Sequence, residues 1–396
     1  MPTPLADSIE FRLTAEQQAH TQGVRAQLQQ LMGARGGWIG FDEYLRQVLY
    51  APGRGYYSAG AAKFGAAGDF ITAPELSPLF AGCIARHFMR LQPGDTLMEL
   101  GAGSGALAAD LLTRLGQLGS LPQHYLILEI SADLRQRQQQ RIAALAPALA
   151  ARVAWLDRLP SRPIHGLILA NEVADALPFR RAVWRDAAWR ELGVAVSMAG
   201  DLQWSERVAP DDLLSAIARA LPGQDGDRSE GFVIEICPAL DGWIAGVAAT
   251  LGRGALLLFD YGLGRDELYH PSRIAGTLRC HFRHRAHDDP FLHPGLQDVT
   301  AWVDFTRIAE AAAESGLQVA SYSTQAAYLL DNQIEAELAY ATGKAANPRE
   351  ALQRRAEVQR LLLPGEMGET FKAMCLTRGM GTAAQGSEIQ DLRRLL

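Results

Sequence analysis

Lysine is scarce in this chain: among its 396 residues only Lys63, Lys344 and Lys372 occur. Arginine supplies nearly all of the positive charge, and 38 basic residues stand against 44 acidic ones, for a net charge of −6. Like charges do not gather in long runs. A mildly acidic chain without a basic stretch is not typical of proteins that bind nucleic acids or membrane surfaces.

Cysteine and long apolar stretches are also scarce. The four cysteines are scattered with no Cys-x-x-Cys spacing, which favours a reducing compartment. No run of about 18 uncharged apolar residues could span a membrane, and the first residues lack the basic start and apolar core of a signal peptide. Together with an arginine-, alanine- and glycine-rich composition typical of a GC-rich genome, these features predict a bacterial, cytoplasmic protein without membrane insertion.

The order of predicted helices and strands indicates an α/β fold. Helices are predicted at 12–32, 41–50 and 79–91, with a Gly- and Pro-rich stretch before the third. From Asp95 on, short apolar strands alternate with amphipathic helices, as expected for a doubly wound, mostly parallel sheet covered by helices. The predicted strands are 96–101, 125–130, 152–156, 166–171 and 255–262, and the helices between them are 106–118 and 133–146.

Residues 181–209 interrupt this alternation. Their period-two pattern and Gly-Asp turn predict an inserted antiparallel β-meander. Segments from Gly276 onward are expected to supply the last strands and one helix, and the tail from Gln333 is expected to be polar and helical. The predicted organisation is a helical N-terminal region with a lid loop at 1–92, a core at 93–330 with its β insertion at about 181–232, and a helical C-terminal region at 331–396.

A glycine-rich turn follows the first predicted strand of the core. Gly101, Ala102, Gly103 and Gly105 lie between an apolar strand and an amphipathic helix, where glycine lets the backbone turn sharply and approach a ligand. The pattern also fits the G-x-G-x-x-A form of a dinucleotide site, and a purely structural turn is a further alternative. No P-loop motif occurs.

The charges around this turn favour S-adenosylmethionine over a dinucleotide. Glu99 lies two residues before the first glycine, and no Lys or Arg occurs from Leu91 to Thr113. A pyrophosphate would meet this carboxylate without a compensating cation, whereas the sulfonium and ammonium groups of S-adenosylmethionine are electrostatically complementary to it. Glu99 is therefore a predicted cofactor-binding residue.

Acidic residues at the ends of the next two strands are candidates for contacts with adenosine. Glu129 ends the second strand, with Ile130 beside it, at a place where a carboxylate can accept hydrogen bonds from both ribose hydroxyls. Asp157 follows the third strand and could meet the adenine amino group. Dinucleotide enzymes use an acid at the position of Glu129, so this residue indicates adenosine and does not choose between the cofactors.

The segment 171–178 contains the residues predicted to act in catalysis. Asn171, Glu172 and Asp175 follow the fourth strand, at the carboxyl edge of the sheet. Paired carboxylates can hold the planar guanidinium of an arginine acceptor and position its nitrogen for methyl transfer. The structural alternative is that Asp175 caps a following helix and Glu172 pairs with Arg180 or Arg181.

Two further groups of residues invite a functional interpretation. Asp69, Thr72 and Glu75 lie in a segment that resembles a lid over a ligand, although Asp69 or Thr72 could equally cap a helix. A second group, of one cysteine and four histidines, suggests a zinc site, but the spacing of these residues matches no closed four-ligand site, so no metal is predicted. Its members are Cys280, His281, His284, His287 and His293.

Nine ordered motifs give the chain a family resemblance. They are GDFITAPE (68–75), ELGAGSGAL (99–107), LEIS (128–131), NEVADALP (171–178), EICPA (235–239), FDYG (259–262), GTLR (276–279), PGLQDVTAWVDF (294–305) and LPGEMGETFKAM (363–374). In this order and over about residues 38–375, they resemble the MidA-like methyltransferases, a family that includes the mitochondrial complex I assembly methyltransferase.

The resemblance implies a class I, Rossmann-like methyltransferase fold with a helical N-terminal addition, and S-adenosylmethionine as methyl donor with S-adenosylhomocysteine as product. For the mitochondrial branch it implies symmetric dimethylation of an arginine on a subunit of respiratory complex I. Carried over by position, it implies cofactor binding by Gly101, Gly103 and Glu129, a lid lined by Asp69, Thr72 and Glu75, a methyl site bordered by Asn171, Glu172 and Asp175, and substrate positioning by His284.

The chain departs from the family pattern at four places. Ala102 stands where proline is common, Ser104 where arginine is common, and Trp302 where histidine is common, and the pair at 173–174 is smaller than usual. The first two changes leave cofactor binding intact. The resulting hypothesis is a protein arginine N-methyltransferase, with a non-catalytic assembly protein of the same fold or a dinucleotide oxidoreductase as alternatives.

Overall fold

The computed structural model describes residues 12–58, 72–222, 228–381 and 389–396, and the chain packs into two compact units. Unit 1 consists of Met1–Phe70, Asp175–Leu240 and Arg265–Trp302, and unit 2 of Ile71–Ala174, Asp241–Gly264 and Val303–Leu396. Both units are discontinuous in sequence, whereas the predicted regions follow one another along the chain.

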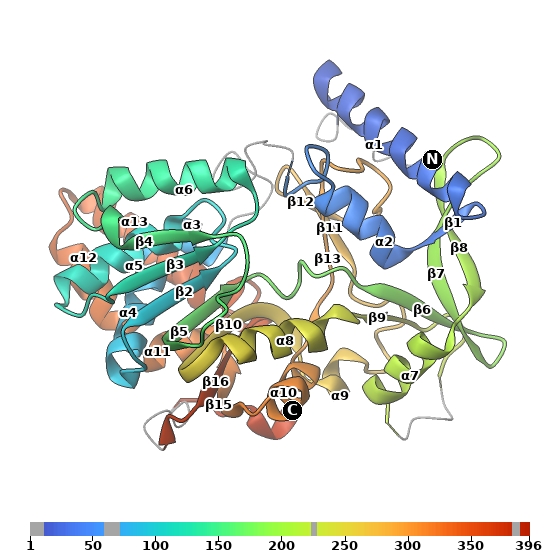
Figure 1. Ribbon diagram of the computed structural model, residues 1–396. Helices are drawn as coiled ribbons and strands as arrows, with labels where there is room; N and C mark the ends of the chain where they lie inside the picture. Colours follow the sequence, from blue (N-terminus) through green and yellow to red (C-terminus); the bar gives the residue numbers. More distant parts are fainter. Residues whose placement is uncertain (1–11, 59–71, 223–227, 382–388) are drawn as a thin grey trace. The chain divides into compact units, whose positions relative to one another are not determined.

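Unit 2 contains the predicted α/β sheet (Figure 1). Its strand order is β15-β16-β10-β5-β2-β3-β4. The five strands from β10 to β4 in this order are all parallel to one another. The predicted strands correspond to β2 (Thr96–Leu100), β3 (His124–Leu128), β4 (Val153–Leu156), β5 (Ile164–Asn171) and β10 (Leu251–Leu263). The doubly wound, mostly parallel fold is thereby confirmed.

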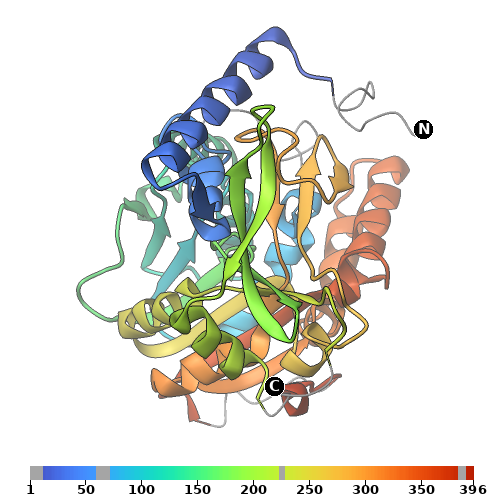
Figure 2. The same cartoon turned by 90° about the vertical axis from the view of Figure 1, so that its right-hand side faces the viewer.

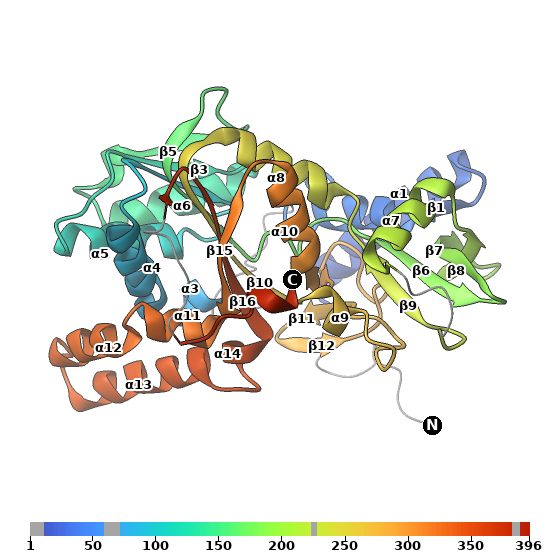
Figure 3. The same ribbon diagram turned by 90° about the horizontal axis from the view of Figure 1, so that it is seen from below.

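Helices connect these strands and cover the sheet. In Figure 3, α4 and α5 lie on one side of the sheet and α8 and α10 on the other. Helix α8 (Ala239–Thr250) begins at the end of unit 1 and continues into unit 2. The other helices of unit 2 are α3 (Ala73–Leu76), α4 (Pro78–Leu91), α5 (Ala106–Gln117), α6 (Ala132–Leu145), η4 (Ala150–Arg152), α10 (Phe305–Glu314), α11 (Gln325–Asp331), α12 (Ile334–Gly343), α13 (Pro348–Leu362), α14 (Met367–Thr370) and η6 (Arg393–Leu395).

The C-terminal part of the sheet differs from the sequence prediction. Strand β16 (Phe371–Arg378) pairs antiparallel with both β10 and β15 (Gln318–Thr324), and seven of its eight residues are buried. The prediction of a wholly helical region after residue 331 is therefore wrong for residues 371–378. Because β16 is buried on both faces, its sequence FKAMCLTR does not alternate between polar and apolar residues, and periodicity gave no signal for a strand. The short strand β14 (Val303–Asp304) pairs parallel with β10.

Unit 1 contains the predicted antiparallel meander. Strands β6 (Arg180–Arg185), β7 (Ala188–Val196) and β8 (Leu202–Val208) pair in succession and are drawn in green in Figure 2. The sheet also includes β1 (Trp38–Gly40), which pairs with β7, and β9 (Val233–Ile236), which pairs with β6. The helix α7 (Asp211–Ala220) follows β8.

A second, three-stranded sheet in unit 1 corrects another expectation. Strand β11 (Arg279–Phe282) pairs antiparallel with β12 (Arg285–His287) on one side and with β13 (Asp298–Thr300) on the other. The segments after Gly276 were expected to complete the main sheet, but this part of them forms a separate layer. The short helix α9 (Arg265–Leu268) precedes it.

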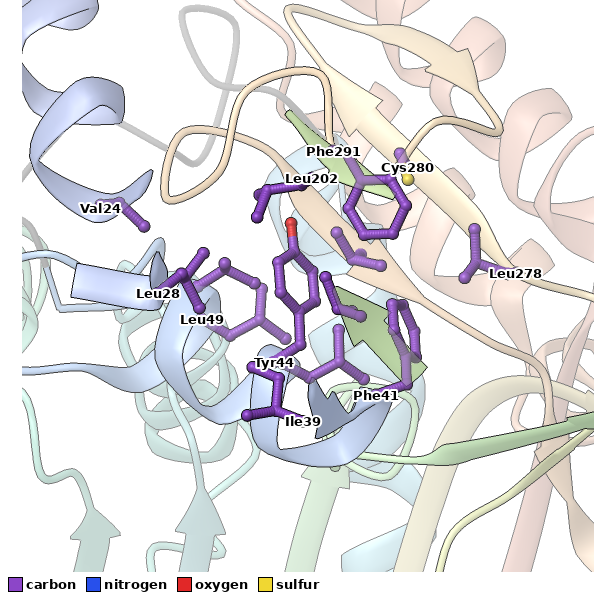
Figure 4. Close-up of a cluster of buried hydrophobic side chains, with 14 of the residues drawn as sticks. Val24, Leu28, Ile39, Phe41, Tyr44, Leu49, Leu202, Leu278, Cys280 and Phe291 are labelled. Atoms are coloured by element: carbon purple, nitrogen blue, oxygen red, sulfur yellow. The ribbon is translucent and has the colours of Figure 1, made fainter. Parts of the chain in front are cut away.

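One apolar core joins the three chain segments of unit 1 (Figure 4). Helix α1 (Ala15–Ala34) begins at a capping box of Thr14 and Gln17 and buries Val24, Leu28 and Met32 along one face. The next helix, α2 (Phe41–Leu45), continues as the π-helical turn η3 (Arg46–Tyr50) and buries Phe41 and Tyr44. These side chains pack with others from the meander and the three-stranded sheet, namely Phe179, Val194, Leu202, Leu278, Cys280, Phe291 and Val299. The N-terminal helices are therefore part of a mixed α/β unit.

Over the residues that the structure describes, every helix is too short or too polar to cross a membrane.

Candidate functional site

The glycine-rich turn lies in unit 2, where β2 passes into α5. Gly101, Gly103 and Gly105 have φ angles of 62°, 51° and 82°, a region that side chains other than glycine rarely adopt. A Cβ atom on Gly105 would lie 3.0 Å from the Cα atom of Gln138 in α6, so the turn and this helix are in close contact. The backbone conformation therefore favours glycine at all three positions, and the packing of α6 adds a second requirement at Gly105.

Glu99 is buried in β2, immediately before this turn. Only 3% of the residue is exposed, and its Oε2 atom accepts a hydrogen bond of 2.7 Å from the Tyr125 hydroxyl of β3. Burial raises the pKa of Glu99 to about 7; the bond from Tyr125 opposes this rise, and the nearby Glu129 carboxylate adds to it. A carboxylate so poorly solvated would be stabilised by a cation.

Glu129 follows β3 and is held by two donors. Its Oε1 atom accepts from the backbone N–H of Ser131 at 2.9 Å, and its Oε2 atom accepts from the side-chain amide of Gln138 at 3.0 Å. Burial raises the pKa of Glu129, while these hydrogen bonds lower it. Ile130, the next residue, is 77% exposed, and Asp157 is exposed just after β4. Glu99 and Glu129 are buried, unlike the surface acids that a purely structural turn would carry.

Part of the predicted lid segment contacts the glycine-rich turn. Asp69 lies outside the described residues, and Thr72 is half-buried at the start of α3 without a side-chain capping bond. Glu75 in α3 accepts hydrogen bonds from the Ser104 hydroxyl and from Arg141 of α6, the latter at 2.7 Å. Arg141 also donates to the Ser104 hydroxyl at 2.6 Å, so its guanidinium lies beside the position where the family pattern commonly has arginine.

Asn171 and Glu172 lie at the carboxyl end of β5, next to the glycine-rich turn. A Cβ atom on Gly101 would lie 3.6 Å from the Val173 side chain, so the two turns are neighbours. Glu172 has a φ angle of 55°, a strained backbone conformation for a residue other than glycine. The Asn171 amide donates to Oε1 of Glu172 at 3.1 Å, and the Asn171 Oδ1 atom is buried without a hydrogen-bond partner.

Asp260 holds this strained turn, and the sequence analysis did not single it out. Its side chain in β10 is fully buried, and Oδ2 accepts from the backbone N–H groups of Val173 at 3.3 Å and Ala174 at 3.0 Å. The backbone N–H of Glu172 donates to the carbonyl of Phe259 at 2.8 Å. An acidic residue inside an otherwise apolar strand was the available signal, because a buried carboxylate needs donors nearby.

A family model for S-adenosyl-L-methionine-dependent methyltransferases matches residues 79–323, which is more than half of the chain. The chain belongs to this family of methyltransferases. Its fold is shared with a solved superfamily member from Burkholderia thailandensis bound to S-adenosylhomocysteine, with 40% identity, a TM-score of 0.90, and coverage of 97% of this chain and 99% of that one. A second structure of a superfamily protein from this organism gives a TM-score of 0.88 at 40% identity.

Curated relatives include eukaryotic proteins named protein arginine methyltransferase NDUFAF7, mitochondrial. The Mus musculus protein is 29% identical over 86% of this chain and 81% of its own length. The Homo sapiens protein is 28% identical over 86% of this chain and 80% of its own length. Membership of the methyltransferase family confirms S-adenosylmethionine as the cofactor and removes the dinucleotide alternative.

Two predicted catalytic residues of this methyltransferase lie in unit 1. Asp175 is buried, and its charge contributes, after burial and Asp298, to raising the pKa of Tyr50 above its usual range. His284 is exposed in the turn between β11 and β12, with a φ angle of 62°. Because Glu172 belongs to unit 2, its convergence with Asp175 and His284 on one acceptor stays a prediction.

The structural alternatives for the 171–178 segment are not what the structure contains. Arg180 pairs with Glu191 at 2.6 Å and with Asp212 at 2.7 Å, and Arg181 pairs with Glu235 at 3.0 Å. The element that follows Asp175 is strand β6, not a helix. Both arginines thus pair with acidic residues of unit 1.

The His and Cys residues of unit 1 form no recognisable metal centre in the described part of the chain: no group of three or more His, Cys, Asp or Glu side chains there could hold an ion. Burial lowers the pKa of His281 to about 4 and also lowers that of His287. The His281 imidazole is therefore neutral near pH 7.

Proposed function

We propose that this methyltransferase transfers a methyl group to an arginine side chain of a protein. The observation that carries the proposal is the Asn171–Glu172 turn: a carboxylate on a strained backbone, beside a buried amide oxygen that lacks a partner and next to the glycine-rich turn. The names of the relatives that are 28–29% identical support arginine as the acceptor.

The residues of unit 2 fit S-adenosylmethionine, which supplies an electrophilic methyl group when bound. The glycine turn lets the backbone approach a ligand closely, and Glu99 provides a buried negative charge for the ammonium and sulfonium groups. Glu129 would accept from the ribose hydroxyls, and Ile130 and Asp157 would contact the adenine. Glu75 and Thr72 would border this site through α3.

The Asn171–Glu172 turn suits a guanidinium acceptor. Methylation forms an N–C bond, breaks a C–S bond and releases one proton from the guanidinium nitrogen to the solvent. Glu172 would hold the guanidinium by charge-assisted hydrogen bonds, and the Asn171 Oδ1 atom would accept a further N–H. Asp260 would keep both groups in place through the backbone of residues 173 and 174.

Incubation with methyl-labelled S-adenosylmethionine and a lysate from a strain that lacks the gene tests the proposal. We expect a labelled protein band that carries methylarginine by mass spectrometry and is absent with the Glu172→Gln variant. Following the family resemblance, a subunit of respiratory complex I and symmetric dimethylation are the first acceptor and product to examine. Cofactor affinity without any labelled protein would refute protein methylation and favour a small-molecule acceptor or the non-catalytic assembly alternative.

The buried Glu99 predicts that cofactor affinity depends on pH. Its pKa of about 7 means that below pH 7 the free protein must release a proton from Glu99 before the carboxylate can face a cation. Affinity for S-adenosylhomocysteine, which keeps the ammonium group, should fall by up to about tenfold per pH unit below 7 and level off above it. Calorimetry between pH 5.5 and 8.5, in buffers of different ionisation enthalpy, measures both affinity and proton release.

The Glu99→Gln variant is the control for this prediction. We expect it to bind more weakly at pH 8 and to lose the pH dependence, because no proton is exchanged at the amide. If this variant keeps the pH dependence of affinity seen in the original protein, the released proton comes from another group.

A further inference from the structure

Gln138 connects three parts of the cofactor site. It lies on the buried face of α6, four residues from Leu134 and from Ile142, and is completely inaccessible to solvent. Its Nε2 atom donates to the carbonyl oxygen of Gly103 at 2.9 Å and to Oε2 of Glu129 at 3.0 Å, and its Oε1 atom accepts from the indole N–H of Trp155 in β4 at 2.9 Å.

The chemistry of the three partners fixes the orientation of this amide. A backbone carbonyl and a carboxylate only accept, and an indole N–H only donates, so the two ends of the Gln138 side chain cannot be exchanged. All of its donors and one acceptor position are used, as buried polar groups require. A close contact between Gly105 and the Cα atom of Gln138 holds the backbone in the same place.

The hydrogen bond from Gln138 helps to fix the orientation of the Glu129 carboxylate. Its Oε1 atom accepts from Ser131 and its Oε2 atom from Gln138, and the backbone of Ile130 also hydrogen-bonds this carboxylate. A carboxylate has about four acceptor positions, so these bonds leave acceptor capacity for a ligand. The protein bonds thus set the plane of the carboxylate. A carboxylate held in a set plane suits two adjacent hydroxyl groups.

We propose that Gln138 is a positioning residue that orients Glu129 for the two ribose hydroxyls of the cofactor and ties this carboxylate to the glycine-rich turn. The inference rests on the proposed placement of the ribose at Glu129. Glutamine can hold both acceptors at this position because it supplies two donors without adding a charge, whereas leucine supplies none.

Binding of S-adenosylhomocysteine and of its 2′-deoxy and 3′-deoxy analogues tests the inference by calorimetry. In the original protein, loss of either hydroxyl should weaken binding by about 10- to 100-fold. In the Gln138→Met variant, S-adenosylhomocysteine should bind about tenfold more weakly, and the discrimination against each deoxy analogue should shrink to a third or less. A purely structural role would weaken all three ligands by one factor and leave the ratios unchanged, which would overturn the proposal.

Two controls separate the possible failures. Gln139→Met changes the exposed neighbour on the same helix and should leave all three affinities within a factor of two. Should Gln138→Met fail to fold, Gln138→Met combined with Trp155→Phe also lacks both donated bonds and leaves no indole N–H unpaired, so the same loss of discrimination is expected. The proposed ribose placement has its own test in the original protein and in the Glu129→Gln variant. If the original protein binds the deoxy analogues as tightly as S-adenosylhomocysteine, or if Glu129→Gln leaves the discrimination between them unchanged, the ribose does not lie at Glu129. That result differs from an unchanged ratio of affinities in the Gln138→Met variant alone.

Discussion

Replacing Glu172 with glutamine is expected to lower kcat by about 10²- to 10³-fold or more, a range typical of the loss of one preorganised electrostatic contact in an active site. Glutamine has the same length and backbone preferences as glutamate, so the strained φ angle of 55° is not altered. The amide keeps an oxygen for the Asn171 bond of 3.1 Å but loses the charge proposed to pair with a guanidinium. The effect should therefore appear in the transfer step.

Single-turnover kinetics with labelled cofactor and the identified acceptor, together with calorimetry for S-adenosylhomocysteine, measure the two halves of this prediction. Cofactor affinity should change less than about twofold, because the residues proposed to hold the cofactor are elsewhere in unit 2. The Glu335→Gln variant removes an exposed carboxylate from α12 and should be fully active. Full activity of the Glu172→Gln variant would refute the role of Glu172.

Replacing Glu337 with glutamine is expected to lower the free energy of unfolding by about 3–5 kcal/mol. Glu337 in α12 is 3% exposed, and its carboxylate accepts from Arg86 of α4 at 2.5 Å and from Arg114 of α5 at 2.8 and 2.9 Å. Arg114 is itself buried, with its guanidinium 4.0 Å from the Tyr340 ring. Loss of the carboxylate would leave a buried cation without a counter-charge, and the cost of that exceeds the worth of an ordinary surface ion pair.

Urea denaturation monitored by circular dichroism measures this loss. The matched control is again Glu335→Gln, on the same helix and exposed, which should change stability by less than about 0.5 kcal/mol. Replacing Arg114 and Glu337 together with leucine should recover part of the loss, because no unpaired charge then remains buried at α5. Equal stability of the two single glutamine variants would show that the ion pairs around Glu337 are not needed for the fold.

The parallel sheet explains why several site residues could be predicted. Glu99 lies near the end of β2, and Gly101 and Glu129 follow β2 and β3. Parallel strands bring their carboxyl ends to one edge of the sheet. The register in which Leu100 pairs with Leu128 and with Ala170 places the ends of β3 and β5 beside the glycine-rich turn. Strand order along the chain was enough to bring these residues together.

Gln138 and Asp260 could not be predicted in the same way. Gln138 lies in the polar stretch 136–140, where nothing in the sequence distinguishes the one glutamine that faces inward from its neighbours. Asp260 depends on the pairing of β10 with β5, which brings its carboxylate to a turn 87 residues earlier in the chain. Hydrogen bonds of this kind depend on packing, and local periodicity does not contain that information.

By itself, the sequence determined the alternation of strands and helices, the glycine-rich turn with its neighbouring acids, and the class of methyl donor, because these depend on local spacing and on the charge of neighbouring residues. Only the tertiary structure decided that the N-terminal helices share one core with the β-meander, that residues 371–378 form a central strand, and that Gln138 and Asp260 hold the site. These features arise from contacts between segments far apart in the chain, where burial and hydrogen-bond satisfaction override local propensity.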